Sequence, residues 1–155
     1  MDEKLRLYRQ ALFLGYKRMF KRYPWQWAVT LTVNYEFDSM MRIRGMLIDW
    51  VRKLQKYEHI QVTLVYIICE KDKHQHVHLL MSGKGNHNGE IKTLFNVNRG
   101  KWRKQWPFFS KIRLVKKQDK ASRYLAGHTF KMNCDEYELD FYNLNLLKKI
   151  DTQNR

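Results

Sequence analysis

The chain has few cysteines, and it lacks long apolar runs. Its two cysteines, Cys69 and Cys134, are too few for a disulfide framework, and neither has the nearby cysteine partner that a zinc ribbon needs. No apolar run approaches the roughly 20 residues that span a bilayer, and no signal-peptide pattern opens the chain. We therefore expect a protein of the reducing cytoplasm that has no membrane partner.

Acidic residues are also scarce relative to basic ones. Thirty lysines and arginines against 15 aspartates and glutamates give a formal net charge of +15 at pH 7. Such an excess favours a polyanionic partner, with nucleic acid ahead of an anionic membrane surface. The 155 residues, of which 44% are apolar and 14% aromatic, are enough for one folded domain and argue against disorder.

The stretch from Glu70 to Met81 is the most informative part of the chain. His76 and His78 alternate with apolar residues, so that on a strand both imidazoles share one face while the apolar residues face the core. The preceding apolar run, residues 62–69, is typical of a strand covered on both faces. The two segments together predict a β-hairpin.

The connection between these two strands decides whether a third group joins the imidazoles. A connection of residues 71–75 places Glu70 opposite His76, and directly opposed residues have Cβ atoms roughly 5 Å apart. Glu70, His76 and His78 would then form a site for a divalent metal ion. A tight turn at residues 72 and 73 would instead place Glu70 opposite Gln75 and break the site.

Hydrophobic periodicity outlines the other elements. It predicts helices over residues 3–21, over 40–54, within 90–106 and over 119–131, with Asp2 as a cap for the first and Asp38 or Ser39 for the second. It predicts strands over residues 25–35 and 110–117. We expect a loop at residues 83–89, and an acidic tail with a short final helix at residues 132–155.

The order of these elements predicts the fold class. Without its ends, the succession is the split β-α-β plan. We therefore predict an α+β fold with a ferredoxin-like or RRM-like central antiparallel sheet, with helices on one face and a functional site on the other. Its first and third strands are neighbours, which brings Thr30 and Thr32 beside His76 and His78. The core is expected to cover about residues 24–131.

Three stretches resemble the motifs of HUH endonucleases, in the order found in rolling-circle replication initiators (Rep proteins). The first is Trp27-Ala-Val-Thr-Leu-Thr32, a strand that ends in Thr-Leu-Thr. The second is His76-Val-His78, a strand preceded by an acidic residue. The third is Arg123-Tyr-Leu-Ala-Gly-His-Thr-Phe-Lys131, a helix that carries a tyrosine. The resemblance implies one domain with the HUH endonuclease fold, which nicks and rejoins single-stranded DNA through a 5′-phosphotyrosine intermediate.

The resemblance also assigns roles to residues. It implies that Tyr124 is the nucleophile and that Mn²⁺ or Mg²⁺ is held by Glu70, His76 and His78. Tyr66, on the hairpin, is the next candidate nucleophile. The implied partner is single-stranded DNA, or a DNA hairpin, at the replication origin of a plasmid or virus, in the cytoplasm of the host cell.

The chain departs from the family pattern after the tyrosine, and it lacks a nucleotide-binding motif. Many members carry a lysine three or four residues after the tyrosine, where this chain has Gly127 and His128. Lys120, His128 or Lys131 would supply the positive charge instead. No nucleotide-binding P-loop is present, because residues 83–85 lack the required spacing. We therefore expect a separate helicase to separate the strands.

Basic residues are densest between Arg99 and Lys131, where eleven stand against one acidic residue. This region is the best candidate for contact with backbone phosphates. Trp102 and Trp106 either stack on bases there or anchor the core. The predicted DNA-binding residues are Thr30, Thr32, Arg99, Arg103, Lys111, Arg113, Lys117 and Arg123.

Three other interpretations remain open from the sequence. A single-tyrosine HUH transposase would share the same chemistry. A non-catalytic, RRM-like single-strand-binding module would bind without Tyr124, although such modules place aromatic rings on the exposed sheet face. The polar face of residues 25–35 instead holds Gln, Ala, Thr, Thr and Asn. A structural zinc protein is the third interpretation.

Overall fold

The computed structural model describes residues 2–33, 39–71, 74–87, 90–93, 99–130, 136–143 and 145–146. The helices are α1 (Glu3–Lys21), α2 (Met40–Glu58), α3 (Arg99–Gln105) and α4 (Gln118–Phe130). The strands are β1 (Trp27–Val33), β2 (Gln61–Lys71), β3 (His74–His87), β4 (Glu90–Thr93), β5 (Ser110–Leu114) and β6 (Glu136–Tyr142). No described helix has the length and apolar character that crossing a membrane requires.

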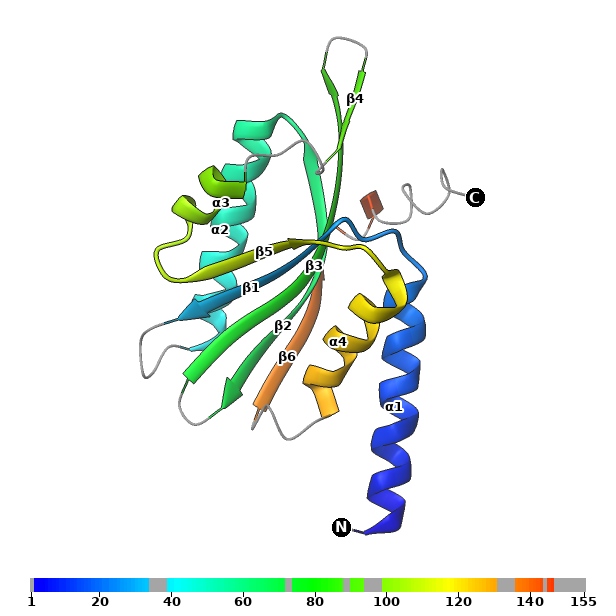
Figure 1. The fold of residues 1–155 in the computed structure, drawn as a ribbon. Coiled ribbons are helices and arrows are strands. Elements are labelled where there is room, and N and C mark those ends of the chain that lie inside the picture. The colour runs from blue at the N-terminus through cyan, green and yellow to red at the C-terminus, as the bar shows by residue number, and fades with distance from the viewer. Residues whose placement is uncertain are drawn as a thin grey trace.

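The strands form one antiparallel sheet in the order β5-β1-β3-β2-β6, and β4 pairs with the far end of β3 (Figure 1). The fold is therefore α+β, as predicted. The elements β1, α2, β2, β3, α3 and β5 follow the expected β-α-β-β-α-β succession, with β4 inserted after β3. The predicted neighbourhood of the first and third strands is confirmed, because β1 pairs with β3.

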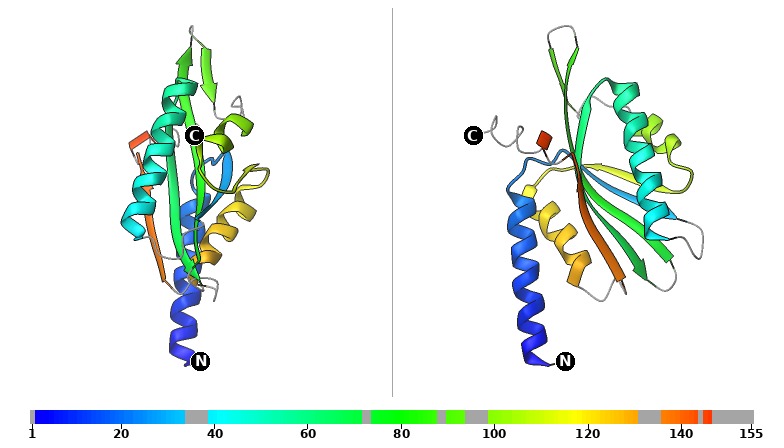
Figure 2. Two further views of the ribbon diagram at one scale, coloured as in Figure 1. Left: turned by 90° about the vertical axis from the view of Figure 1, so that its left-hand side faces the viewer. Right: turned by 180° about the vertical axis from the view of Figure 1, so that it is seen from behind.

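Helices cover both faces of the sheet, so the expectation of helices on one face alone is wrong. We call the side of α2 and α3 the α2 face, and the side of α1 and α4 the α4 face (Figure 2). The strands are apolar on both sides, and each side packs against its own pair of helices. The first turn of α1 extends past the end of α4 (Figure 1).

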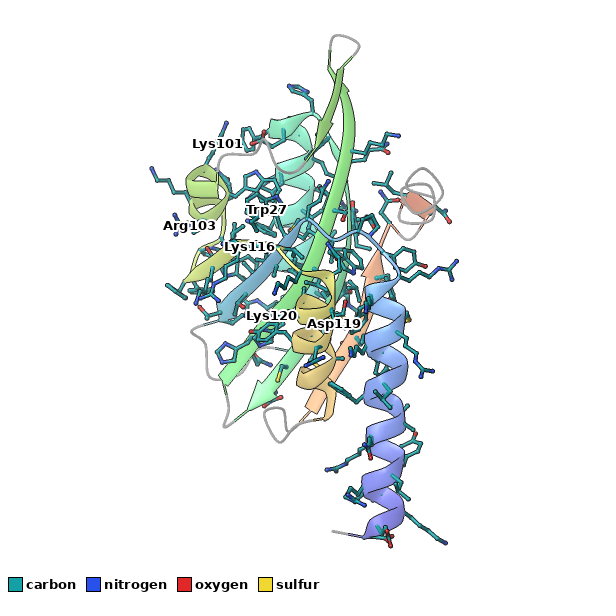
Figure 3. The ribbon with its side chains drawn as sticks, turned by 45° about the vertical axis from the view of Figure 1, so that its right-hand side comes forward. Trp27, Lys101, Arg103, Lys116, Asp119 and Lys120 are labelled. Carbon is teal, nitrogen blue, oxygen red and sulfur yellow. The ribbon has the colours of Figure 1, made fainter. Side chains whose placement is uncertain are left out.

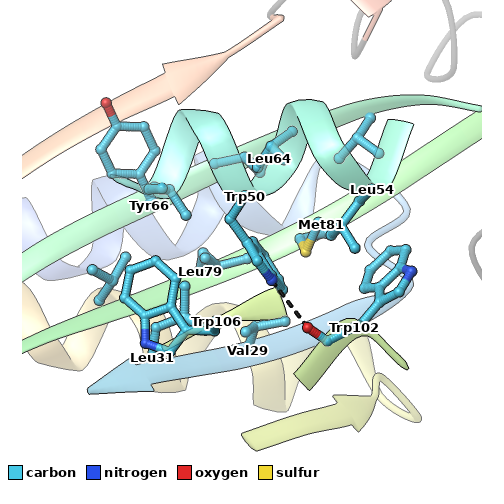
Figure 4. Close-up of a cluster of buried hydrophobic side chains, with 14 of the residues drawn as sticks. Val29, Leu31, Trp50, Leu54, Leu64, Tyr66, Leu79, Met81, Trp102 and Trp106 are labelled. Atoms are coloured by element: carbon cyan, nitrogen blue, oxygen red, sulfur yellow. Dashed lines mark hydrogen bonds between the residues drawn. The ribbon is translucent and has the colours of Figure 1, made fainter. Parts of the chain in front are cut away.

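The larger cluster lies on the α2 face and centres on three tryptophans. Trp50 of α2 packs edge-on against Trp102 and Trp106, with ring centroids 6.0 and 6.4 Å apart. The indole nitrogen of Trp50 also donates to the backbone carbonyl of Trp102 at 3.1 Å (Figure 4). Both Trp102 and Trp106 are buried, which makes them core anchors and not surfaces for stacking bases.

The smaller cluster lies on the α4 face. Phe20 of α1 and Leu125 of α4 pack there against Val65 and Ile67 of β2. Cys69 is buried on the same face and is disulfide-bonded, a bond that the sequence did not predict.

Two segments differ from the expected secondary structure. Residues 83–87 continue β3 instead of forming a loop, and their partner β4 makes a hairpin that projects from the body (Figure 1). Within the expected acidic tail, β6 adds an edge strand next to β2. The sheet thus extends beyond the predicted core boundary at residue 131. The signal was present, since Tyr137, Leu139 and Phe141 alternate with acidic residues.

Candidate active site

A polar row crosses three strands on the α4 face. In the register of β1, Thr30 lies opposite His78 of β3 on one side and opposite Lys111 of β5 on the other. Two residues further along β1, Thr32 lies opposite His76. Opposed residues of an antiparallel pair point to the same face. The first two motifs, far apart in the sequence, therefore meet on one surface.

Tyr124 of α4 lies directly over this row. Its phenol oxygen is 3.4 Å from Nδ1 of His78, and the two rings meet edge-on with centroids 5.9 Å apart. The hydroxyl of Thr30 approaches the same nitrogen, also at 3.4 Å. Both distances are at the long end for hydrogen bonds. His78 is 7% exposed and Tyr124 is 50% exposed, so the phenol is held against a buried imidazole yet stays accessible from solvent.

The position of Tyr124 follows from the way α4 packs. Leu125 and Ala126 are buried in the α4-face cluster, which leaves the preceding tyrosine at the rim. The first residue of the helix, Gln118, fixes its start: its side chain accepts from the backbone N–H of Trp25 at 3.1 Å and donates to the carbonyl of Trp25 at 2.7 Å.

Asp119 ties the tyrosine helix to α1. Its carboxylate forms ion pairs with Lys17 at 3.3 Å and Lys21 at 3.2 Å, both from α1, and with Arg123 at 3.0 Å one turn along α4. The hydrogen bonds from Lys21 and Lys17 hold the pKa of the Asp119 carboxyl below its usual value. Asp119 lies at the first turn of α4, where Figure 3 places it beside Lys120. Neither the anchoring role of Gln118 nor that of Asp119 was predicted from the sequence.

The predicted register of Glu70 is wrong. In the pairing of β2 with β3, Lys71 lies opposite His74, and Glu70 lies opposite Gln75. His76 lies opposite Cys69 instead. Because successive side chains alternate between faces, Glu70 is on the α2 face, whereas His76 and His78 are on the α4 face. Glu70 therefore does not join the imidazoles.

The remaining donors only partly fit the metal site that the family resemblance implies. The rings of His76 and His78 have centroids 6.1 Å apart, and both are on the face of Tyr124. Among the described residues, no group of three His, Cys, Asp or Glu side chains is arranged to hold a metal ion. Two imidazole nitrogens are thus the protein donors that fit, and the other positions would fall to water or substrate oxygens.

The predicted DNA-binding residues fall on two sides of the sheet. Lys111 and Arg113 are exposed on β5 and share the α4 face with Thr30. Lys117 is exposed just before α4, where Lys120 is exposed too, and Arg123 is paired with Asp119. Arg103 instead lies on α3, at the α2 face. The side chains of Arg99 and His128, and the whole of Lys131, lie outside the described residues.

Phe109 is a candidate contact that the sequence analysis did not find. Its carbonyl accepts hydrogen bonds from the backbone N–H of Thr32 at 3.0 Å and from the Thr32 hydroxyl at 2.9 Å. Its side chain is 68% exposed. An exposed ring beside a polar strand is a suitable platform for base stacking. The available signal was an aromatic pair, Phe108 and Phe109, at the start of a predicted strand.

Tyr66 is excluded as the nucleophile. It lies on the α2 face and is 2% exposed. Burial, with the nearby Asp140 carboxylate, raises the pKa of its phenol to about 12. A phenol that is enclosed and this hard to ionise is a poor nucleophile.

Comparisons with known proteins add little to what the geometry of the site shows. No protein-family model matches the chain, and no curated protein matches it significantly. Among solved structures, the chain is similar to the hypothetical protein ORF119 from Sulfolobus islandicus rod-shaped virus 1, with 16% sequence identity and a TM-score of 0.45. The match covers 79% of this chain and 96% of that one. A likeness this distant carries no argument about function.

Proposed function

We propose that the chain is an HUH endonuclease of ferredoxin-like fold that initiates rolling-circle replication by nicking and rejoining single-stranded DNA. The observation that carries the proposal is the contact of a half-exposed tyrosine with the histidine motif. Tyr124 Oη is 3.4 Å from His78 Nδ1, although 46 residues separate them. Thr30 meets the same nitrogen. Three motifs that the resemblance assigns to one reaction therefore share one small surface.

The reaction is a transesterification with Tyr124 as nucleophile. Its phenol oxygen attacks the phosphorus of a phosphodiester, the bond from phosphorus to the 3′ oxygen breaks, and a 5′-phosphotyrosine and a 3′-hydroxyl form. The phenol proton is lost, and the departing 3′ oxygen gains one. Because the phosphotyrosine ester conserves the energy of the broken phosphodiester bond, the reverse attack by a 3′-hydroxyl can rejoin the strand.

A phenol is mostly protonated at neutral pH, since its ordinary pKa is about 10. It therefore needs a base or positive charge nearby. Lys120 is exposed one helical turn before Tyr124, and Lys111 is exposed in the same polar row. These two cations are the described groups best placed to stabilise the phenolate and the phosphate.

His76 and His78 would hold Mn²⁺ or Mg²⁺, and imidazole favours Mn²⁺ of these two. When bound, the ion would stabilise and orient the nonbridging oxygens of the phosphate. The rest of the face would contact the strand: Arg113 through phosphates, and Phe109 by stacking on a base. The substrate would be single-stranded or hairpin DNA at a plasmid or viral origin, opened by a separate helicase in the host cytoplasm.

Intact-mass analysis tests this function. The protein is incubated with Mn²⁺ and a random-sequence pool of single-stranded DNA, and nuclease then trims any attached strand. We expect a nucleotide adduct on Tyr124 and none on Tyr124→Phe. Tyr57→Phe is the matched control, because Tyr57 is also 50% exposed but belongs to α2. An adduct that persists in Tyr124→Phe would overturn the nucleophile assignment.

Histidine variants separate catalysis from binding. His76→Ala with His78→Ala should abolish the adduct, yet leave most of the salt-sensitive binding of single-stranded DNA, which depends on lysine and arginine. If wild-type protein binds the pool but forms no adduct with any divalent ion, the chain is a non-catalytic binding module instead. An adduct that resists chelation would reject the metal while keeping the tyrosine.

A further inference from the structure

A second basic surface lies on the opposite side of the sheet from Tyr124. Its residues point outward from two helices and are all exposed; we call them the α2–α3 basic surface, and they are Arg42, Arg52, Lys53, Lys56, Lys101, Arg103 and Lys104. Asp49 is the one exposed acidic residue on these two helices, because Glu58 is buried. Figure 3 shows Lys101 and Arg103 on α3, apart from Lys120 on α4.

The two helices are held together closely enough to act as one surface. Trp50 of α2 packs against Trp102, and its indole N–H donates to the backbone carbonyl of Trp102 at 3.1 Å. At the outer edge, the Lys101 ammonium lies 4.6 Å from the ring centroid of Tyr57 on α2. The cations of α3 are therefore held beside those of α2.

The cations of this surface differ from those elsewhere in the structure in how few of them form ion pairs. On the α4 face, Asp119 pairs with cations of α1 and α4. On the α2 face, Arg44 of α2 pairs with Glu138 of the edge strand β6. Within the described part of the chain, no ion pair involves Arg52, Lys53, Lys56, Arg103 or Lys104. Crowded like charges repel each other, and a polyanion relieves that repulsion.

The shape of the surface selects the kind of polyanion. The tryptophans beneath it are buried. Among the described residues of α2 and α3, Tyr57 is the one exposed ring, and Lys101 lies over it, so these helices present no array of rings to stack on unpaired bases. The lysines and arginines can still bind phosphates, which every nucleic-acid sequence presents. From Arg42 to Lys56, α2 rises about 21 Å, which is the length of about six base pairs at ~3.4 Å each.

We propose that the α2–α3 basic surface binds the phosphate backbone of double-stranded DNA, independently of sequence. The single strand and the duplex would then lie on opposite faces of one sheet. This inference does not require Tyr124 to be a nucleophile, since it rests on the charge and packing of the other face.

Fluorescence anisotropy with a blunt, random-sequence DNA duplex of about two helical turns tests the proposal. The variant Lys53→Glu, Lys56→Glu, Lys104→Glu should weaken duplex binding at least about tenfold and lower the salt slope by about 2–3. The control variant Lys4→Glu, Arg6→Glu, Arg18→Glu changes the net charge equally at exposed positions of α1, and it should weaken binding far less.

Several outcomes overturn the proposal. These are wild-type affinity in the α2–α3 variant, equal losses in both triple variants, or an equal loss for single-stranded DNA. If duplex RNA competes as well as duplex DNA, the partner is any nucleic-acid duplex and not DNA in particular. Glutamine at the same three positions provides a milder second variant should glutamate disturb the helices. Tyr124→Phe should bind the duplex normally, so a failure of the proposed nicking leaves this test intact.

Discussion

Tyr66 and Tyr124 lie on opposite faces of the same sheet, and their phenols have very different surroundings. Tyr66 is 2% exposed, and its pKa is raised to about 12 by burial. Tyr124 is 50% exposed, and its oxygen is 3.4 Å from a buried imidazole nitrogen. The α2 face is closed by tryptophan packing between two helices, whereas α4 leaves the rim of its face accessible. We therefore expect the α2 face to carry more of the stability, whereas the α4 face presents the candidate reactive groups.

The largest difference between the faces should appear in stability. Trp50→Ala removes the central ring of the α2-face cluster and should cost about 3–5 kcal/mol in the free energy of unfolding, because neighbouring side chains cannot fill the cavity. Leu125→Ala on the α4 face removes a smaller side chain and should cost less, within the range of about 2–5 kcal/mol for such a substitution. Urea denaturation measures both. A larger loss for Leu125→Ala would reverse the comparison.

The pH dependence of stability should follow Tyr66. Its pKa is about 12 in the folded protein against about 10 in an unfolded chain. The protonated phenol therefore stabilises the fold fully below pH 10, and this contribution is lost as the pH rises towards 12. It amounts to about 2–3 kcal/mol. Unfolding free energies at pH 9 and 11 should show a smaller alkaline loss for Tyr66→Phe than for wild type.

If Tyr66→Phe loses as much unfolding free energy between pH 9 and 11 as the wild-type protein, the enclosed phenol of Tyr66 does not control the alkaline loss of stability.

The smallest effect should come from the start of the tyrosine helix. Gln118→Ala removes both hydrogen bonds to the backbone of Trp25 and should cost about 1–2 kcal/mol. It should also slow adduct formation, because α4 loses an anchor above His78, without affecting duplex binding. Gln10→Ala, at an exposed position of α1, is the control, with an expected cost below about 0.5 kcal/mol. Equal adduct rates in the two variants would show that Gln118 does not position Tyr124.

Local patterns in the sequence were sufficient for most of the elements. Asp2 caps α1 and Ser39 caps α2, each by accepting a backbone N–H, because capping depends on residues only a few positions apart. The alternation around His76 and His78 assigned both imidazoles to one face of a strand. The approach of Tyr124 to them was expected only from the resemblance to HUH endonucleases, because no local pattern links residues so far apart in the sequence.

Properties that depend on pairing and packing could not be obtained in this way. The face of Glu70 depends on whether the hairpin turn has two residues or five, and a change of one position in register exchanges the faces. The strand β6 has a visible alternation, yet its strand character depends on an edge of β2 being available. Likewise, Arg103 and Arg123 belong to one basic segment of the sequence but lie on opposite faces of the sheet.

The sequence by itself determined the periodicities, the helix caps, the charge excess and which side chains share a strand face, since all of these act over a few residues or over the whole composition. Tertiary structure alone decided that Glu70 lies on the face away from the imidazoles, how far each tyrosine is enclosed, and how the cations divide between the two faces. These properties depend on contacts between segments far apart in the chain, whose register and packing no local pattern encodes.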